Sequence, residues 1–159
     1  MDSCFAVEKT LGKLAKWLRL LGFDSVYEQD VPADSFENIK QKRILLTRTM
    51  HVWKRHASRA CILIKSNGVF DQMQEVVRAC NLLPETMRPF SRCNRCNTVI
   101  APVAKAAVYG KVPDYVWETH DSFQICVHCE KIYWQGTHSA HIQEIIKQLF
   151  DPALKRKCF

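Results

Sequence analysis

Hydrophobic positions near the N-terminus change from a continuous run to a helical stripe. Residues 5–7 are all apolar, which is long enough for a short buried strand. After Glu8, apolar side chains recur at helical spacing, at Leu11, Leu14, Ala15, Leu18 and Leu21. Gly22 then stands where a helix would be capped. The pattern predicts a strand that turns at once into an amphipathic helix, with Glu8 between them.

Strand-like and helical patterns alternate over the next part of the chain. Short apolar runs predict three further strands, over residues 23–29 (centred on 25–27), 43–47 and 60–65. Helical patterns lie between and after them, over residues 34–39, 50–59 and 70–83. Runs with a continuous apolar centre suit parallel strands that are buried on both faces. We therefore expect a small parallel α/β domain, with helices on both faces of the sheet, over residues 1–88.

The composition changes at Pro89, where two C-x-x-C pairs and an irregular, polar middle begin. The pairs are Cys93 with Cys96 and Cys126 with Cys129. Two such turns joined by a hairpin or loop are typical of a zinc ribbon, in which four thiolates hold one tetrahedral ion. A redox pair is the alternative, but it is normally single and follows a strand of the α/β unit. We expect a structural zinc, because four thiolates leave no open position on the metal.

The C-terminal part of the chain predicts one more helix. Apolar side chains recur on one face over residues 141–150, and a short basic terminus follows at residues 155–157. We expect this helix to pack back on the domain. The second predicted unit is therefore a zinc ribbon with a tail helix, over residues 89–159.

Charge and composition narrow the class of protein. The net charge is +7 and the pI is about 9.1, which favours a polyanionic partner such as a nucleic acid, although many small basic proteins bind none. No apolar stretch approaches the roughly 20 residues that span a bilayer, and the N-terminus lacks the pattern of a secretory signal. The remaining cysteines lie apart rather than as a disulfide framework. We expect a cytoplasmic protein with no membrane segment.

Glu8 and the lysines that follow it are the first candidates for chemistry. In open α/β sheets, ligands bind at the carboxyl ends of the strands, where Glu8 is expected to lie. An acid there also suits the first turn of a helix, so a capping role remains open. Lys9, Lys13 and Lys16 recur on one helix face, as a solvated surface or as contacts to phosphates. Two aromatic residues, Tyr133 and Trp134, suit either base stacking or filling of the groove beside the ribbon.

Four segments of the chain carry a resemblance to a known family. They are, in order, LGKLAKWLRLLGFD, RILLTR, SRCNRCN and CVHCEKIYWQGTH. Together they resemble the Mut-7 C-terminal RNase domain family, over nearly the whole chain. The resemblance implies a PIN-like nuclease fold fused to a zinc ribbon, a metal-dependent ribonuclease activity, RNA as the partner, and zinc on the four cysteines.

The resemblance also implies which side chains act on RNA. PIN-type nucleases hold divalent cations with carboxylates at strand ends, and here the matching acids are Glu8, Asp24 and Asp34. They would hold Mg²⁺ or Mn²⁺, which activates a water for phosphodiester hydrolysis. The RNA backbone would be held by Lys9, Lys13, Lys16 and Arg48. Simpler interpretations remain for two of the acids: Asp24 satisfies backbone donors, and Asp34 is the N-cap of its helix.

Two positions depart from the family pattern. The first strand of the family ends in Asp, where this chain has Glu8, and the L-T-R-D motif ends here in Thr49. Threonine supplies no negative charge and is a poor ligand for Mg²⁺. The alternative function is therefore a catalytically weak or inactive RNA-binding or assembly module. An adaptor that docks proteins through the ribbon is a third hypothesis.

Overall fold

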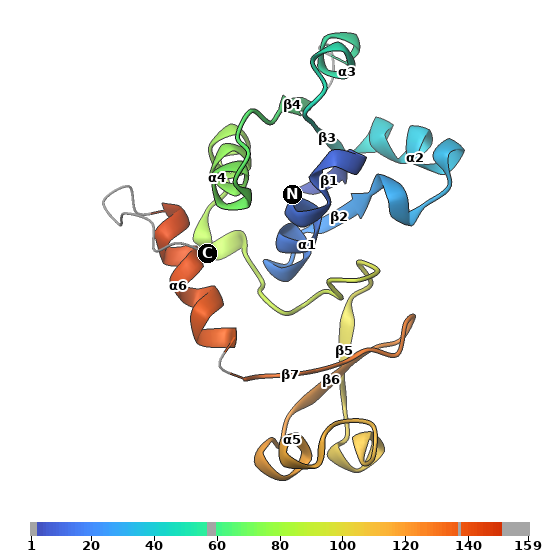
Figure 1. The fold of residues 1–159 in the computed structure, drawn as a ribbon, viewed down its shortest axis with the longest axis vertical. Helices are drawn as coiled ribbons and strands as arrows, with labels where there is room; N and C mark the ends of the chain where they lie inside the picture. The colour runs from blue at the N-terminus through green and yellow to red at the C-terminus, as the bar shows by residue number, and fades with distance from the viewer. Residues whose placement is uncertain (1–2, 57–59, 137, 151–159) are drawn as a thin grey trace.

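A computed structural model describes residues 3–56, 60–136 and 138–150 of the chain (Figure 1). Its first part is a parallel sheet in the order β2-β1-β3-β4. The strands are β1 (Cys4–Val7), β2 (Asp24–Tyr27), β3 (Ile44–Thr47) and β4 (Cys61–Leu63). The α/β prediction is confirmed, and all four carboxyl ends lie along one edge of this sheet.

Helices cover both faces of the parallel sheet. They are α1 (Gly12–Leu20), α2 (Ala33–Ile39), α3 (Met50–Arg55) and α4 (Val69–Ala79). Successive side chains of a strand point to opposite faces, so Phe5 and Val7 are buried in the cluster that includes α1 and α4. Ala6 instead packs with Phe36 of α2 and Val52 of α3. The short apolar strands are buried on both sides, as their composition predicts.

Gly22 ends α1 in a left-handed turn. Its φ is +95°, and its N–H donates to the carbonyl of Arg19 at 3.0 Å, while the N–H of Phe23 donates to Leu18 at 2.9 Å. This pair of bonds is a Schellman cap. A Cβ at Gly22 would lie 2.3 Å from the carbonyl oxygen of Arg88. Glycine is therefore required both by the turn and by the chain that crosses beside it.

The second part of the chain is built on an antiparallel sheet. Strands β5 (Ile100–Val103), β6 (Phe123–Cys126) and β7 (Ile132–Trp134) pair in the order β5-β6-β7. The stretch between β5 and β6, expected to be irregular, contains a 3-10 helix (Lys105–Val108) and α5 (Asp114–Thr119). Val108, Val112 and Val116 pack there with Phe123 in a small separate cluster. The expectation was wrong because valines four residues apart can pack under very short helices.

Several helix ends also differ from the predictions. Pro32 is the N-cap of α2, and Asp34 lies inside its first turn without capping it. Helix α4 ends at Ala79, and Pro84 begins a separate 3-10 turn (Pro84–Thr86). The tail helix α6 (His138–Phe150) starts three residues earlier than expected. The predicted helical residues 57–59 and the basic terminus lie outside the described residues.

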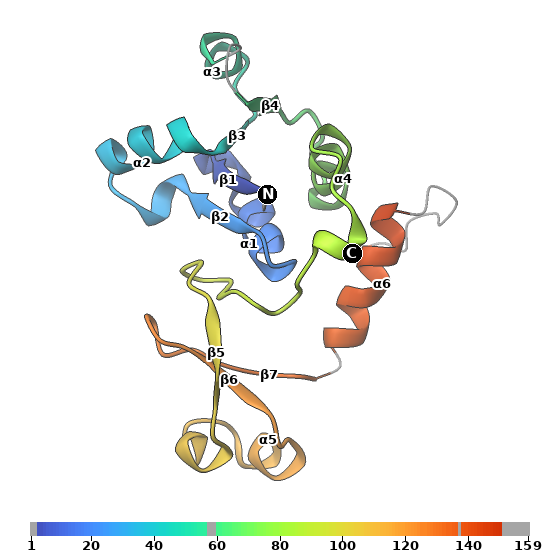
Figure 2. The ribbon, with the colours of Figure 1, turned by 180° about the vertical axis from the view of Figure 1, so that it is seen from behind.

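Helix α6 returns to the parallel sheet and packs beside α4, as both views show (Figures 1 and 2). Its Ile142, Ile145 and Leu149 belong to the same buried cluster as Phe5 and Leu14. The expected return of the tail helix is confirmed. The boundary at residue 88 stays a prediction, and the core joins residues from both sides of it. In the described ranges, no helix has the length and apolar character needed to cross a bilayer.

Candidate functional site

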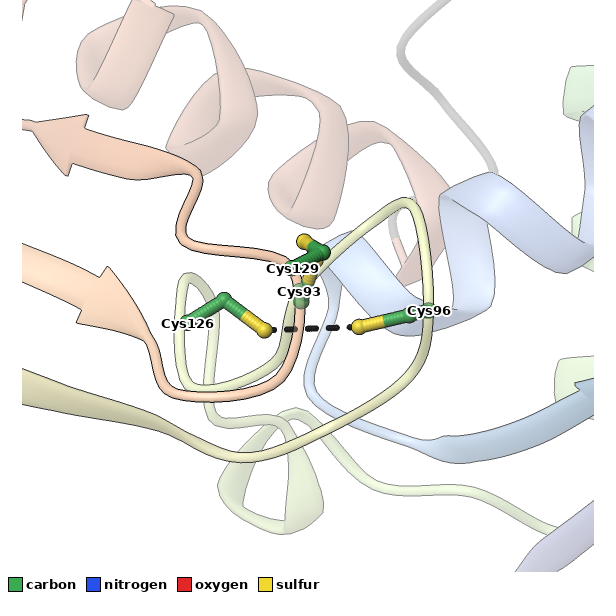
Figure 3. A group of neighbouring side chains, drawn as sticks. All are labelled: Cys93, Cys96, Cys126 and Cys129. Carbon is green, nitrogen blue, oxygen red and sulfur yellow. Dashed lines mark hydrogen bonds between the residues drawn. The ribbon is translucent and has the colours of Figure 1, made fainter.

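The four cysteines of the C-x-x-C pairs meet at one point at the tip of the ribbon. Their Sγ atoms all lie within 4.8 Å of one another, and Cys96 and Cys126 are 3.3 Å apart (Figure 3). Cys93 and Cys129 are 3.5 Å apart. A tetrahedral Zn²⁺ with bonds near 2.3 Å separates its sulfurs by about 3.8 Å, whereas a disulfide needs about 2.05 Å. The cysteines are positioned to bind a metal such as zinc.

Both cysteine pairs adopt the same turn. The N–H of Asn97 donates to the carbonyl of Cys93 at 2.9 Å, and the N–H of Glu130 donates to Cys126 at 2.8 Å. Asn97 and Glu130 each have a left-handed φ, of 68° and 58°. The backbone alone therefore aims two sulfurs at one point from each turn. This is the convergence that the C-x-x-C spacing predicts.

Tyr133 of β7 supports the metal centre. Its hydroxyl donates to Sγ of Cys93 at 3.0 Å. Burial would by itself raise the pKa of Cys93, but the Tyr133 hydroxyl and backbone N–H groups outweigh burial and lower this pKa. A lower pKa favours the thiolate, which is the form that binds metal. The hydroxyl of Tyr133 thus stabilises the thiolate of Cys93, one of the four candidate metal ligands.

Glu8 lies directly after β1, at the carboxyl edge of the parallel sheet, inside a cage of donors. Its Oε2 accepts from the Thr47 hydroxyl at 2.6 Å and from the Arg48 N–H at 2.9 Å. Its Oε1 accepts from the Thr49 hydroxyl at 2.7 Å. Partial burial would raise the pKa of Glu8, but the bonds from Thr47, Thr49, Arg48 and Thr10 outweigh burial and lower it. The carboxylate is therefore held ionised at neutral pH.

Two further acids share a hollow with Glu8. This hollow of about 150 Å³ lies between the sheet edge, α2 and α3, and Glu28 and Glu37 also line it. Glu28 follows β2 and accepts the Lys9 N–H at 2.7 Å, while Glu37 pairs with Lys40. Two basic residues, Lys40 and Arg55, also line the hollow. We call this the Glu8 hollow.

Asp24, predicted to join Glu8, lies at the opposite edge of the sheet. It opens β2 and pairs in register with Cys4, the first residue of β1. Its carboxylate accepts from Arg43 at 2.6 and 3.1 Å, and from the side-chain amide of Asn97 at 2.8 Å. Asp24 therefore joins the sheet to the first cysteine turn, and the structure does not bring it to Glu8.

The remaining predicted residues lie on the surface. Asp34 is exposed in the first turn of α2 and does not line the Glu8 hollow. Lys9, Lys13 and Lys16 are exposed along the 3-10 turn (Lys9–Leu11) and α1 that follow Glu8. Arg48 is exposed beside Glu8, and its guanidinium donates to Asn67 Oδ1 at 2.5 Å.

The comparison with family models covers almost the whole of this fold. The model of the Mut7-C RNAse domain matches residues 3–146, which include both sheets and all four cysteines. The chain belongs to the Mut7-C RNAse domain family. Among curated proteins and solved structures, neither comparison gives a match.

The Mut7-C chain has carboxylates near the carboxyl edge of its parallel sheet, but three of them do not lie close enough together to share one ion among the described residues. Carboxylates such as Glu8, Glu28 and Glu37 are the hard oxygen ligands that Mg²⁺ and Mn²⁺ prefer. In the part of the chain that the structure describes, however, the four cysteines are the one group of three or more ligand side chains close enough to share an ion. The predicted set of Glu8, Asp24 and Asp34 is not gathered around one ion in this geometry.

Arg19 is an important residue of this fold that the sequence analysis did not single out. The pattern places it beside the lysines, yet it is only 2% exposed. Its guanidinium donates to the Ser25 carbonyl at 2.8 Å, to the Arg95 carbonyl at 2.9 Å and to Asp30 Oδ2 at 2.7 Å. The lone signal in the sequence is that Arg19 follows Leu18 within the apolar stripe.

Asp24 makes the stability of the Mut7-C fold depend on pH. Burial would raise the pKa of Asp24, but Arg43, Asn97 and Arg92 outweigh burial and lower it. An acid with a lowered folded pKa stabilises above its unfolded pKa, of about 3.9, and loses this contribution as the pH falls through the folded value. We expect Asp24→Asn to cost about 1–3 kcal/mol at pH 7, and the cost to shrink below pH ~4. Thermal melts of both proteins over a pH series measure this difference.

The comparison of the wild type with Asp24→Asn has an internal control. Both carry the same cysteines, so acid release of zinc affects them equally. A gap between their melting temperatures that stays constant from pH 7 to pH 3 would contradict the role assigned to Asp24.

Proposed function

We propose that this Mut7-C domain is a ribonuclease that hydrolyses RNA phosphodiester bonds at the Glu8 hollow. The observation that carries the proposal is the position of Glu8, an ionised carboxylate at the carboxyl edge of a parallel sheet. Ligands of open α/β sheets bind at this edge. The match to an RNase family over residues 3–146 supports RNA as the substrate.

The proposed reaction uses a divalent cation, Mg²⁺ or Mn²⁺, in addition to the structural zinc. Glu8 would hold it; Glu28 and Glu37 line the same hollow, but the three carboxylates do not lie close enough together in this structure to share one ion. When bound, such an ion lowers the pKa of a water and stabilises charge on the phosphate. The Thr47 hydroxyl and the Arg48 N–H keep the Glu8 carboxylate in place at the edge.

Basic side chains around the Glu8 hollow would bind the RNA backbone. Lys9, Lys13 and Lys16 are exposed on the segment that follows Glu8, and the guanidinium of Arg48 suits bidentate contact with a phosphate. Binding of this kind weakens steeply with salt, because each phosphate contact releases counterions. A cluster of four metal-binding thiolates requires reduced cysteines, which supports a reducing compartment, and we propose the cytoplasm.

A second candidate function is an RNA-binding module that does not cleave. Thr49 occupies the position of an expected acid, and its hydroxyl donates to Glu8 at 2.7 Å. The Glu8 carboxylate therefore has a hydrogen-bond donor at this position without a cation. Two acids there would instead repel each other until a cation bound. This contact is the observation that favours the second function.

Cleavage of a labelled single-stranded RNA tests the two functions. We expect Mg²⁺ or Mn²⁺ to support cleavage, Ca²⁺ to support less, and Glu8→Gln to reduce the rate at least about hundredfold. Glu85→Gln, a change at an exposed glutamate outside the hollow, is the matched control. Divalent ions should be withheld rather than chelated, since a strong chelator also attacks the zinc site.

The outcomes separate the candidates. Cleavage that survives Glu8→Gln would remove the Glu8 hollow as the active site. An inert wild type that gains Mn²⁺-dependent cleavage in Thr49→Asp would show a nuclease site that has lapsed, and the RNA-binding function would then stand.

A further inference from the structure

A large groove lies on the ribbon side of α1, away from the Glu8 hollow. Its volume is about 800 Å³, and α1, α5, β7 and the start of α6 all contribute to it. Aromatic rings line it from three of these elements: Trp17, Tyr115, Tyr133 and Trp134. We call it the aromatic groove. The hollow of the proposed reaction uses none of these residues.

The rings of the aromatic groove are accessible, and its charge is positive. Trp134 is 39% exposed and Tyr115 is 67% exposed. Lys131 lies 5.3 Å from the centre of the Tyr133 ring and lines the same groove. Among the described residues that line it, none is Asp or Glu. A face with aromatic rings, a cation and no acid complements a ligand with π-faces and negative charge.

The lysines of α1 connect this groove to Glu8. Residues three and four apart share a helix face, so Lys13 lies beside Trp17, which lines the groove, and beside Lys16. Lys9 stands at the other end of the row, next to Glu8. From Lys9 to Trp17 the row covers roughly 12 Å at 1.5 Å per residue. A continuous basic track thus leads from the proposed reaction site to the aromatic groove.

We propose that the aromatic groove holds unpaired bases of a single-stranded RNA whose phosphates follow the lysine row to Glu8. The inference rests on the proposed function and names its substrate class: RNA that is unpaired for several nucleotides to one side of the bond at Glu8. Bases inside a duplex are stacked on each other, so they offer no free faces to Trp134 and Tyr115. Aromatic platforms beside a basic track are the general solution for single strands, since every base has a π-face.

The known strength of base stacking on aromatic side chains sets the expected effect of removing one ring from the groove. Loss of one base-stacking side chain weakens binding by about 5-fold to about 150-fold in single-strand-binding proteins. We expect Trp134→Ala to fall in this range and Lys131→Gln to weaken binding several-fold, with a shallower salt dependence. Strands too short to reach past the lysine row should lose nothing.

Fluorescence anisotropy of labelled oligouridines, from about 4 to about 16 nucleotides, measures these effects. It is done on the full chain with zinc bound and no other divalent ion, so no cleavage is needed. Tyr109→Ala is the matched control, since Tyr109 is a 70% exposed aromatic residue of the same part of the fold that does not line the groove. Lys131→Gln keeps the test valid if Trp134→Ala does not fold.

The expected result is a length-dependent loss in both groove variants, an unchanged control, and weaker binding of an abasic strand. If Trp134→Ala, Lys131→Gln and Tyr109→Ala all bind RNA equally well, the aromatic groove is not the base-binding site, even if the RNA is cleaved at Glu8. Equal binding of abasic and normal strands leads to the same conclusion. If no RNA binds to the wild type, the groove and the proposed function both fall, whereas binding without cleavage removes the nuclease function alone.

Discussion

Cys93→Ser is expected to abolish tight zinc binding and to unfold the ribbon while the parallel sheet stays folded. Structural zinc supplies about 10–16 kcal/mol of apparent binding free energy in small zinc peptides, and Cys93 is a fully buried member of the cluster. Serine is a far weaker ligand than a thiolate. The loss of this one sulfur should therefore remove most of the stabilisation that the metal gives.

The ribbon cannot replace this energy with its own core. Its apolar side chains fall into two small clusters, one around Val108, Val116 and Phe123 and one around Ile100 beside the cysteines. A three-stranded sheet with so little buried surface is marginal without a metal or other staple. The parallel sheet has its own larger cluster, which α6 completes.

Zinc content per chain and hydrogen exchange measure this prediction together. In Cys93→Ser, amides of β5 and β6 should lose protection while those of β1 and β3 keep it. Cys61→Ser is the matched control, since Cys61 is a free thiol of β4 outside the cluster. One zinc per chain and a protected β6 in Cys93→Ser would contradict the assigned role of the metal.

The parts of this fold that the sequence predicts are those with a strong local period. The stripe that ends at Gly22 predicts α1 and its cap, because helical spacing and a left-handed glycine are both local properties. The C-x-x-C pairs predict a metal centre because each turn aims its sulfurs by its own backbone. Short helices such as α5 carry less than two periods, so their pattern is not visible in the chain.

The acid cluster shows what a motif leaves undetermined. Asp24 begins β2 and Glu8 follows the end of β1. A parallel strand of this length covers about 13 Å at 3.3 Å per residue, so acids at opposite ends of paired strands cannot meet on one ion. The acids that do share the hollow with Glu8 are Glu28 and Glu37. They come from the end of β2 and from α2, and only the three-dimensional arrangement brings them together.

The last prediction concerns the junction between the two sheets. Arg19→Met is expected to destabilise the protein by about 2–4 kcal/mol, because methionine leaves the buried carbonyl of Ser25 and the partly buried carbonyl of Arg95 without their donor. Asp30, the acidic partner of Arg19, is 37% exposed and stays solvated, so its charge adds little to the cost. The melting temperature should fall by roughly 5–15 °C.

Thermal unfolding of zinc-loaded protein measures this change, with Arg78→Met as the control. Arg78 is an exposed arginine on α4, so the same substitution there removes a charge without opening the junction. Equal melting temperatures in the two variants would contradict a structural role for Arg19.

A double-mutant cycle with Asn97→Ala locates the effect. Asn97 accepts the Ser25 N–H at 3.0 Å and belongs to the first cysteine turn, while Arg19 accounts for the Ser25 carbonyl. Both side chains fix the same residue of β2 to the same turn, so their losses should couple by about 0.5 kcal/mol or more. Additive losses would mean that the sheet and the ribbon are joined elsewhere. Coupled losses, together with an unchanged zinc content, would mean that the ribbon keeps its metal without these contacts and is joined to β2 through these two side chains.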